Sequence, residues 1–558
     1  MVSKNQQEFL YVPLGGVGEI GMNMYLYGFG TKHDRKWIMV DAGIAFADDS
    51  QPGIESIIAD TAFIENELDN LLGIFITHAH EDHQGALDKI WPILDVPIYG
   101  TPFSTNLIAR KLAETNFADD VEIINVQQGD SISVGPFTVE FIPVTHSIPE
   151  ANALAITTEL GTVVHTGDWK LDSNPVIGRT TDIKRLKQLG DAGVLALIGD
   201  STNVFRSGQS PTEHEVGQNL ADAIKGASGC IAITSFASNA ARVYSIIKAA
   251  EAADKNVVIA GRSLWRIIDI AREEGYFKDL PHLYDQNDFN TLPHNNTVVV
   301  VTGTQGEARA ALARIAKGEH PAVKLRANDT VIFSSTTIPG NEKSVGYVVN
   351  ALADSDINII NSQTHKVHVT GHPLREEMMQ MYEWLKPETS IPVHGEVMHV
   401  REHIKLAKSL GIKNTVKALN GTMVRLAPGK TKVIGEVEHG RIYEDGNLLT
   451  PAWDGPVKER RKLSFVGIVA ISIVFDRKGK LRAEPEIFSM GLPEYDDDGV
   501  SMFDIIADKV DEVIQAMPNG VRKKEKPARE AFRIGVRRQV ERIWGKKTIV
   551  QIMLSYVD

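Results

Sequence analysis

The chain has 558 residues, 43% of them hydrophobic and 23% charged, with a formal net charge of -13. One hydrophobic core does not extend over this length, so about three or four domains are expected. The acidic balance argues against a protein coated in basic surface for non-specific nucleic-acid binding, although it leaves room for a local basic groove.

Two features of the sequence limit its location and its metal chemistry. No apolar run reaches the roughly 20 residues of a membrane helix, and the first residues lack the apolar core of a secretory signal. We therefore expect a cytoplasmic protein with no membrane association. Cys230 is the only cysteine, which excludes intramolecular disulfides and thiolate zinc clusters, so a metal here needs His, Asp and Glu ligands.

Short β-rich runs bounded by Gly, Asp and Asn dominate the first 169 residues. Helical periodicity lies between some of them, for example over residues 104–115. This mixture predicts a layered α/β domain whose first part covers residues 1–211.

Three glycines near the N-terminus, Gly16, Gly18 and Gly21, match the G-x-G-x-x-G spacing of dinucleotide-binding proteins. That motif also needs a helix that starts at the glycines. The segment that follows, MNMYLYGF, alternates like a strand instead. A tight turn between strands is the better interpretation.

Four strand-then-helix units follow over residues 212–364, with helices expected at 239–253, 264–274, 307–317 and 342–352. Such alternation predicts a parallel sheet with helices on both faces. Open α/β sheets bind ligands outside the carboxyl ends of their strands. Polar residues follow the strands here, and we predict that four of them bind substrate: Ser238, Asn239, Arg262 and Ser263.

Ligand-rich sequence returns after residue 364, in HKVHVTGH and IPVHGE, so the parallel-sheet unit is predicted to be an insertion. Residues 365–435 then complete the first domain, 436–461 form a linker, and 462–558 form a C-terminal α/β domain. Its segment 522–547 holds eleven Lys or Arg against three Glu. This segment is either a solvated helix face or a surface for RNA or an acidic neighbour.

The segment THAHEDH carries the densest set of potential metal ligands. His78 and His80 are two apart, so they point to the same side of a strand end, and Asp82 and His83 follow in the turn into a helix. Two pairs of ligands on one loop suit two ions better than one. We predict two Zn²⁺ per chain, with Mn²⁺ possible. The predicted ligands are His78, His80 and His146 on one ion, Asp82, His83 and His394 on the other, and Asp168 on both.

The chain resembles the metallo-β-lactamase superfamily, within it the β-CASP nucleases, and most closely the ribonuclease J family. The segments that carry the resemblance are GGVGEIGMN, THAHEDHQGAL, HTGDWKLD, GDSTN, FASN, GRS, TGTQGE, IPGNE, HVTGH and PVHGE. The resemblance implies a metallo-β-lactamase αββα sandwich, an inserted parallel-sheet β-CASP domain and a small α/β C-terminal domain. It covers essentially the whole chain.

The resemblance also implies an activity: zinc-dependent hydrolysis of RNA phosphodiesters, by 5'-to-3' exonuclease and endonuclease cleavage, in mRNA decay and rRNA maturation. Two ions roughly 3.5 to 4 Å apart suit such an in-line displacement. Three residues then have catalytic roles: His372 as general acid, Asp200 as the carboxylate that orients it, and Asp82. Asp41 matches an aspartate that orients rather than ligates. For His372, a strand-end histidine bonded to the backbone is the alternative.

The turn HVTGH precedes a helical pattern, and successive backbone N–H groups at such a place bind phosphate. By resemblance this turn grips the nucleotide, and a 5' monophosphate held there sets a measuring distance to the metals. The predicted substrate-binding residues of the turn are His368, Val369, Thr370, Gly371 and His372.

Some positions depart from the family pattern, notably Ala241, Met22, Ala308, Arg309 and Thr370. None is a metal ligand, but they suggest a second, less active paralogue. The partners expected are therefore RNA and either a second copy or a ribonuclease J paralogue. A structural RNA-binding subunit that supports an active paralogue is the alternative, and a small-ester hydrolase would leave the inserted sheet without a purpose.

Overall fold

A computed structural model describes residues 6–453 and 455–558. The chain forms two compact units: the described part of Met1–Ala45 with Ile57–Ile442, and Phe46–Ser56 with Tyr443–Asp558. Among the described residues, no helix is both long enough and apolar enough to cross a membrane.

Two sheets face each other in the first unit. The eight-stranded sheet contains, in spatial order, β25 (Lys432–Glu436), β24 (Thr422–Ala427), β1 (Glu8–Gly15), β3 (Met24–Thr31), β4 (Asp34–Val40), β7 (Leu71–Phe75), β8 (Ile98–Gly100) and β9 (Ile123–Asn125). The seven-stranded sheet contains β10 (Ser131–Val134), β11 (Phe137–Pro143), β12 (Asn152–Thr158), β13 (Gly161–His165), β14 (Ala196–Asp200), β21 (Thr389–Val393) and β23 (Asn414–Thr415).

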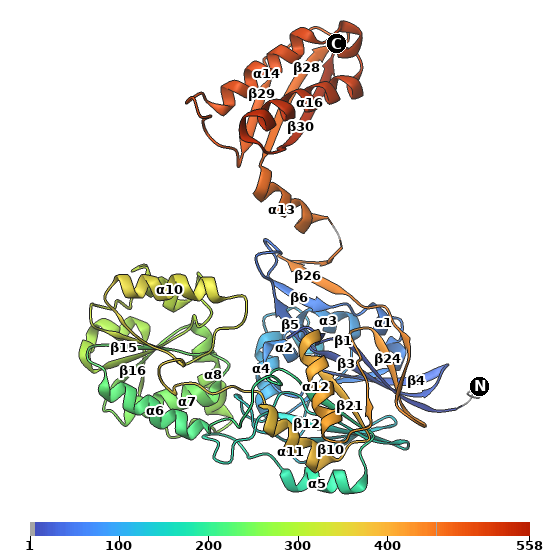
Figure 1. Ribbon diagram of the computed structural model, residues 1–558, viewed down its shortest axis with the longest axis vertical. Helices are drawn as coiled ribbons and strands as arrows, with labels where there is room; N and C mark the ends of the chain where they lie inside the picture. The colour runs from blue at the N-terminus through green and yellow to red at the C-terminus, as the bar shows by residue number, and fades with distance from the viewer. Residues whose placement is uncertain (1–5, 454) are drawn as a thin grey trace. The chain divides into compact units, whose positions relative to one another are not determined.

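Side-chain alternation explains why these sheets stack. Phe9 and Tyr11 of β1 pack with Phe141 of β11 and Ile198 of β14 in one core cluster between the sheets. Because successive residues of a strand point to opposite faces, the intervening side chains are left for an outer layer of helices. Those helices are α3 (Leu87–Leu94) and α4 (Pro102–Leu112) beside one sheet, and α5 (Ile183–Ala192) and α11 (Arg375–Leu385) beside the other (Figure 1). The predicted αββα sandwich is confirmed.

The inserted unit has a six-stranded, entirely parallel sheet. Its strands are, in order, β17 (Leu283–Asp285), β16 (Asn256–Ala260), β18 (Thr297–Val301), β15 (Ile231–Thr234), β19 (Thr330–Phe333) and β20 (Asn358–Ile360). Val257 and Ile259 face one core cluster, whereas Val258 and Ala260 face another. The helices are α6 (Glu213–Gly226), α7 (Ala240–Glu251), α8 (Arg262–Glu273), α9 (Ala311–Ala316) and α10 (Glu342–Asp354) (Figure 1).

Two details of the insertion differ from the sequence prediction. The sheet has six strands rather than four, because β17 and β20 are three-residue strands at its edges. The helix predicted at 307–317 starts only at Ala311, since residues 307–310 form a turn in which Ala310 N donates to Glu307 O.

The glycine-rich segment near the N-terminus is a turn between strands, as predicted. β1 leads into β2 (Val17–Gly18) and then β3, and β2 pairs with β22 (Gly395–Glu396). The carbonyl of Gly16 accepts a hydrogen bond from His394 N at 2.8 Å. The turn therefore holds the loop that carries a predicted metal ligand.

The second unit is a small α/β structure. Its sheet has the order β29 (Glu486–Met490), β28 (Ile468–Asp476), β30 (Ile549–Val557). Helices α14 (Met502–Ala516) and α16 (Glu525–Trp544) pack on one face, where Ile471 and Phe475 are fully buried. The segment predicted as a linker contains β26 (Arg441–Asp445), β27 (Leu448–Pro451) and the start of α13 (Pro456–Val466). The domain boundaries themselves stay predictions.

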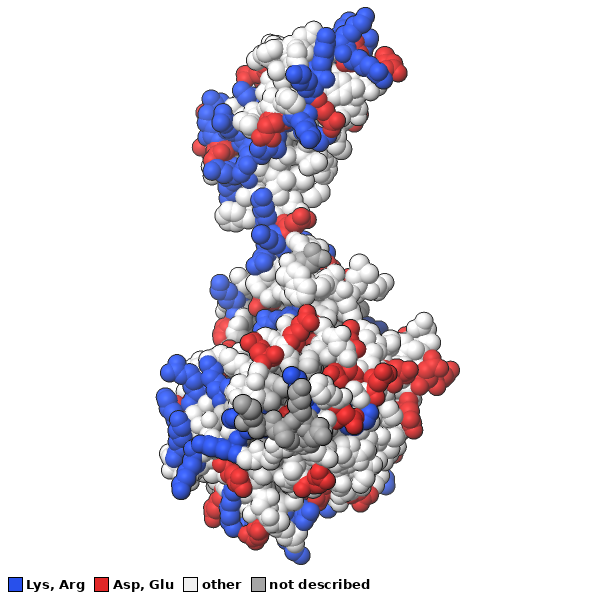
Figure 2. Space-filling view, turned by 90° about the vertical axis from the view of Figure 1, so that its right-hand side faces the viewer, with Lys and Arg blue, Asp and Glu red and all other residues white. Residues whose placement is uncertain are grey.

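Basic side chains gather on this second unit (Figure 2). The predicted basic segment includes α16, where two arginines form ion pairs within the helix, Arg529 with Glu525 and Arg533 with Glu530. Part of the positive charge is therefore balanced locally. Surface pairs of this kind add little stability.

Candidate metal centre

The predicted metal ligands all lie just beyond the carboxyl ends of strands in the first unit. β7 leads to His78, His80 and the one-turn helix α2 (Glu81–Gln84), which contains Asp82 and His83. His146 follows β11, Asp168 follows β13 and His394 follows β21. Neighbouring strands that end at one edge of the sandwich bring together side chains that are more than 300 residues apart in sequence.

Two groups of side chains meet there, and they share one carboxylate. Ligand atoms of His78, His80, His146 and Asp168 lie within 4.8 Å of one another, as do those of Asp82, His83, Asp168 and His394. A third group, also within 4.8 Å, adds Asp200 and His372 to Asp168 and His394. The structure thus brings all seven predicted ligands together.

The spacing of ring nitrogens in the first group fits a cation. His80 Nδ1 lies 3.1 Å from His78 Nε2 and 3.1 Å from His146 Nε2. Tetrahedral zinc with bonds of about 2.0 to 2.1 Å separates its ligand nitrogens by about 3.3 Å. Burial lowers the pKa of each of these three histidines. Neutral rings keep the lone pairs that a metal needs.

Asp168 lies at the centre of the site and is 2% exposed. Its Oδ2 is 3.2 Å from His83 Nε2, 3.7 Å from His78 Nε2 and 3.8 Å from His146 Nε2. Among the described residues its Oδ1 has no hydrogen-bond partner. A buried carboxylate oxygen without a partner is costly. A carboxylate shared by two cations removes that cost, so the residues fit a two-metal site.

Three of the predicted ligand histidines are oriented by partners at their Nδ1 atoms. His83 Nδ1 lies 2.7 Å from the buried Asp41 Oδ2, His394 Nδ1 lies 2.8 Å from Thr202 Oγ1, and His146 Nδ1 lies 2.6 Å from Gly371 O. Each contact occupies Nδ1 and turns Nε2 toward the site. Such partners fix the ring and raise metal affinity. Asp41 is thus placed to orient, not to ligate.

His83 and His394 differ from the other predicted ligand histidines in the direction of their pKa shift. Burial alone would lower the pKa of His83, but the carboxylates of Asp168, Asp82 and Asp41 raise it well above its usual value. Burial also acts to lower the pKa of His394, but Asp168 and the neighbouring carboxylates outweigh burial and raise that pKa. Cations that bind here therefore compete with protons for these two rings.

His372 and Asp200 form a separate pair at the edge of the metal ligands. His372 Nδ1 is 2.8 Å from Asp200 Oδ2, and Asp200 is buried. Burial acts to lower the pKa of His372, yet Asp200 and Asp168 outweigh it and raise that pKa to about 9. Bound cations oppose part of this shift. With Nδ1 held by the carboxylate, Nε2 is the nitrogen available to a substrate.

The turn 368–372 is braced by hydrogen bonds to and within its backbone and side chains. Asn203 Nδ2 donates to Thr370 Oγ1 at 2.9 Å, and the N–H of His372 donates to the same hydroxyl at 3.2 Å. The first N–H groups of α11 are also occupied, Leu374 N by Glu377 Oε2 and Arg375 N by Arg206 O. No residue of the turn has a positive φ. Within the turn, the N–H of His372 is therefore occupied. Phosphate binding by the turn stays a prediction, with side chains such as His368 placed to take part.

The other predicted substrate-binding residues lie at the carboxyl edge of the inserted sheet. Asn239 caps α7, where its Oδ1 accepts from Arg242 N at 2.8 Å, and Ser238 precedes it. Arg262 and Ser263 are exposed at the start of α8. Ala241 N donates to Ser147 O at 3.3 Å, so this edge contacts the loop that carries His146.

Sequence reasoning missed several residues that support the site. Arg242 and Glu213 form a fully buried ion pair behind the 368–372 turn. Asn23 Nδ2 donates to Asp82 O at 3.0 Å. The only available signal was an arginine among the apolar residues of a helix, and that pattern does not say what the arginine contacts.

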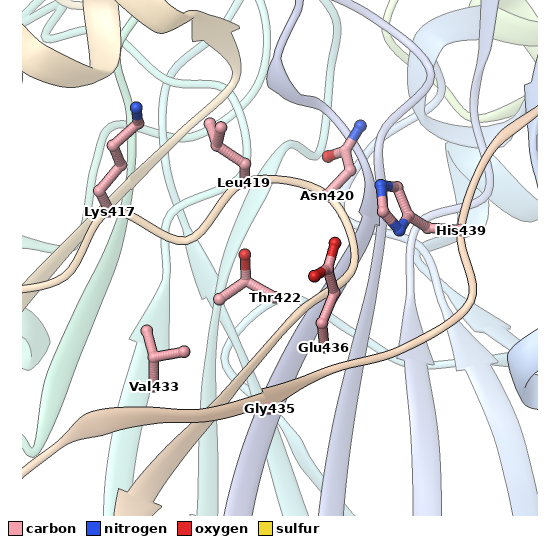
Figure 3. A pocket seen from close by; sticks show the side chains of 8 residues that line it. All are labelled: Lys417, Leu419, Asn420, Thr422, Val433, Gly435, Glu436 and His439. Carbon is pink, nitrogen blue, oxygen red and sulfur yellow. The ribbon is translucent and has the colours of Figure 1, made fainter.

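A pocket of about 440 Å³ lies apart from this centre (Figure 3). It is lined by Lys417, Leu419, Asn420, Thr422, Val433, Gly435, Glu436 and His439. None of the predicted site residues is among these lining residues. Asn420 links the pocket to the glycine-rich turn, because its Oδ1 accepts from Val17 N at 3.0 Å.

The sandwich, the inserted sheet and the shared ligand sets define a metal-dependent hydrolase of the metallo-β-lactamase superfamily. Four families match the chain: "Beta-lactamase superfamily domain" over 36–185, "Ribonuclease J, beta-CASP domain" over 228–352, "Zn-dependent metallo-hydrolase RNA specificity domain" over 359–417 and "Ribonuclease J C-terminal domain" over 455–557. These matches extend from the sandwich to the second unit.

Similar full-length proteins identify the family. Ribonuclease J of Sinorhizobium meliloti is 45% identical over 551 residues, which cover 99% of this chain and 98% of that protein. Ribonuclease J of Mycolicibacterium smegmatis is 38% identical, with 90% and 89% covered. The chain belongs to the ribonuclease J family and is a metal-dependent ribonuclease that acts on RNA.

A solved structure supports the fold alone. A protein of unknown function from Enterococcus faecalis V583 matches with a TM-score of 0.53 and 16% identity, covering 75% of this chain and 100% of that one.

Gly371→Ala should weaken metal binding. A Cβ at this position would lie 2.7 Å from His146 Cε1, so the ring or the turn must move. We expect metal affinity to fall about 10- to 100-fold, as for the loss of a partner that orients a ligand. Elemental analysis after equilibrium dialysis against buffered zinc measures it. Gly346→Ala is the matched control, since nothing lies within 4 Å of its added Cβ. Full metal content in Gly371→Ala would contradict the orienting role of the Gly371 carbonyl.

Proposed function

We propose that the chain binds two divalent cations, Zn²⁺ by preference with Mn²⁺ possible, and uses them to hydrolyse RNA from its 5' end. One observation carries the proposal. Two sets of four ligands share Asp168, a buried carboxylate whose Oδ1 has no hydrogen-bond partner among the described residues. His78, His80 and His146 would hold one cation, and Asp82, His83 and His394 the other.

The chemistry divides between the cations and the chain. When bound, two cations act as Lewis acids that stabilise the charge of an in-line displacement at phosphorus. His372, kept protonated by Asp200, donates a proton from Nε2 to the leaving 3' oxygen. Asp200 is a positioning residue in this step, because its Oδ2 binds Nδ1 of His372 at 2.8 Å.

The 368–372 turn supports exonuclease action. It contains His372 and, through the Gly371 carbonyl, it holds His146. A 5' monophosphate bound by this turn would lie at a fixed distance from the metal ligands, so that cleavage releases mononucleotides. Endonuclease cleavage requires RNA to pass the turn without its end being held. We also propose a cytoplasmic role in mRNA decay and rRNA maturation, as the resemblance to ribonuclease J implies.

The alternative of a purely structural subunit is not favoured. The matched relatives carry the name ribonuclease J, and none of the departures from the family pattern replaces a predicted metal ligand. Ala241 is buried beside Ser147 rather than within a ligand set. The departure from the family pattern at Ala241 therefore changes the wall of the site, not its donors.

Removing Asp82 and His83 together should abolish RNA hydrolysis. The double variant Asp82→Ala, His83→Ala deletes two donors of one ligand set, and we expect activity to fall by about 10³-fold or more. Release of mononucleotides from 5'-monophosphorylated RNA, together with bound metal by elemental analysis, measures it. His33→Ala removes an exposed histidine and serves as the control. Equal activity in both variants would refute the two-metal proposal.

His372→Ala should lower kcat while metal stays bound. Loss of a general acid typically costs about 10²- to 10⁴-fold. Single-turnover cleavage and metal content are measured on the same sample, with the exposed His282→Ala as control. Loss of metal with kcat would instead make His372 a ligand, as its presence in the third group of side chains allows.

The second unit supports self-association. The sheet face away from α14 and α16 exposes three large apolar side chains, Phe488 at 55%, Met490 at 63% and Met553 at 51%. We propose that this face binds a second copy of the chain or of a paralogue.

Met553→Glu should shift sedimentation from dimer to monomer, whereas Arg538→Glu, exposed on α16, should not. A monomeric wild-type protein would contradict this.

A further inference from the structure

Arg242 is a fully buried arginine on α7, at the junction between the inserted sheet and the segment that enters the 368–372 turn. Its Nε donates to Glu213 Oε1 at 2.6 Å and its Nη2 to Glu213 Oε2 at 2.9 Å. Glu213 is the first residue of α6, where the helix dipole favours a carboxylate. A guanidinium does not lose its charge, so its burial requires a partner for every donor.

The remaining nitrogen of Arg242 faces the turn. Nη1 donates to Ser334 O at 3.1 Å, to Ser334 Oγ at 2.9 Å and to Val367 O at 3.2 Å. Ser334 Oγ in turn donates to Val367 O at 2.7 Å. The same Nη1 lies 3.3 Å from Nδ1 of His368. One side chain thus joins the end of β19 to the start of the turn.

The network also reaches the metal loops. Glu213 N donates to Asp172 Oδ2 at 2.8 Å, and Lys170 Nζ lies 3.2 Å from the same oxygen. Lys170 N donates to Thr145 O at 2.8 Å. Lys170 comes two residues after the shared ligand Asp168. The insertion is therefore tied through buried charges to the segment that carries this ligand.

His368 is held as a neutral ring next to this charge. Burial and the neighbouring Arg242 lower the pKa of His368 to about 3. A guanidinium has donors only, so its contact with Nδ1 is a hydrogen bond when Nδ1 carries the lone pair. In this tautomer the ring proton lies on Nε2, and the half-buried imidazole presents a neutral N–H donor of the kind that binds a phosphate oxygen. A backbone hydrogen bond with Ser334 also holds the ring.

We propose that Arg242 is a positioning residue that fixes His368 and the backbone around Val367 so that the turn binds the 5'-terminal phosphate of RNA. This inference rests on the proposed function, in which the turn receives the RNA end. Arg242 itself does not touch RNA, because its side chain is fully buried. Lysine cannot replace it, since an ammonium does not form the bidentate pair and reach the turn at once.

The test compares two RNAs that differ only in a 5' monophosphate or a 5' hydroxyl. Wild-type protein should prefer the monophosphate, and Arg242→Lys should reduce that preference by about tenfold through a higher KM for the monophosphorylated RNA, with kcat changed less. Ser334→Ala, which removes one link between Arg242 and Val367, should reduce the preference by a smaller factor. Ser245→Ala is the matched control: its hydroxyl donates to Glu213 Oε1 at 3.1 Å and, among the described residues, makes no hydrogen bond to the turn.

Each outcome decides between the two proposals. If wild-type protein does not distinguish the two 5' ends, end binding by the turn is wrong and this inference falls with it. If wild-type protein does distinguish them, but Arg242→Lys and Ser334→Ala lower activity on both RNAs in equal proportion, the role of Arg242 is only structural and this inference alone is overturned. Should Arg242→Lys unfold below the assay temperature, the comparison of Ser334→Ala with Ser245→Ala decides.

Discussion

A carboxylate buried among imidazoles is the constraint on which this structure depends. Asp168 is 2% exposed, and ring nitrogens of His83, His78 and His146 surround its Oδ2. Such a cluster of lone pairs and negative charge is unfavourable in a protein interior unless cations join it. The metal requirement is thus a consequence of burial as much as of ligand type, and the sandwich edge has to keep these donors together before a cation arrives.

The fold meets this constraint through hydrogen bonds between segments that are distant in sequence. The Gly371 carbonyl, from the segment after the insertion, binds His146 from the segment before it. Gly16 O binds His394 N, and Asp41 binds His83. Every one of these contacts joins two different strands or turns of the sandwich. The hydrogen bonds that orient the predicted ligands are therefore the same ones that hold distant segments of the first unit together.

The parts of the structure that could be predicted are those that leave a local pattern in the sequence. Strand alternation predicted the layered sandwich, and ligand residues after apolar strands predicted which side chains meet. Short edge strands such as β17 and β20 lack enough residues to show a period. The brace on the 368–372 turn was hidden for another reason: it depends on Asn203 and Glu377, whose contacts are set by tertiary packing. A turn followed by a helix looks open to phosphate in sequence, and only the structure shows that the N–H groups of His372, Leu374 and Arg375 are occupied.

The turn itself explains why an insertion belongs in this enzyme. His368 contacts Arg242 of the insertion, Gly371 contacts a metal ligand, and His372 contacts Asp200. Five consecutive residues therefore connect the inserted domain, the predicted metal ligands and the pair formed by His372 and Asp200. In the proposed function, a rigid segment of this kind would fix the distance between an RNA end and the reacting phosphorus, which a small-ester hydrolase does not need. Because the three contacts lie within five residues, a displacement of one is expected to move the others, and the proposed function then couples recognition of the RNA end to catalysis through this geometry.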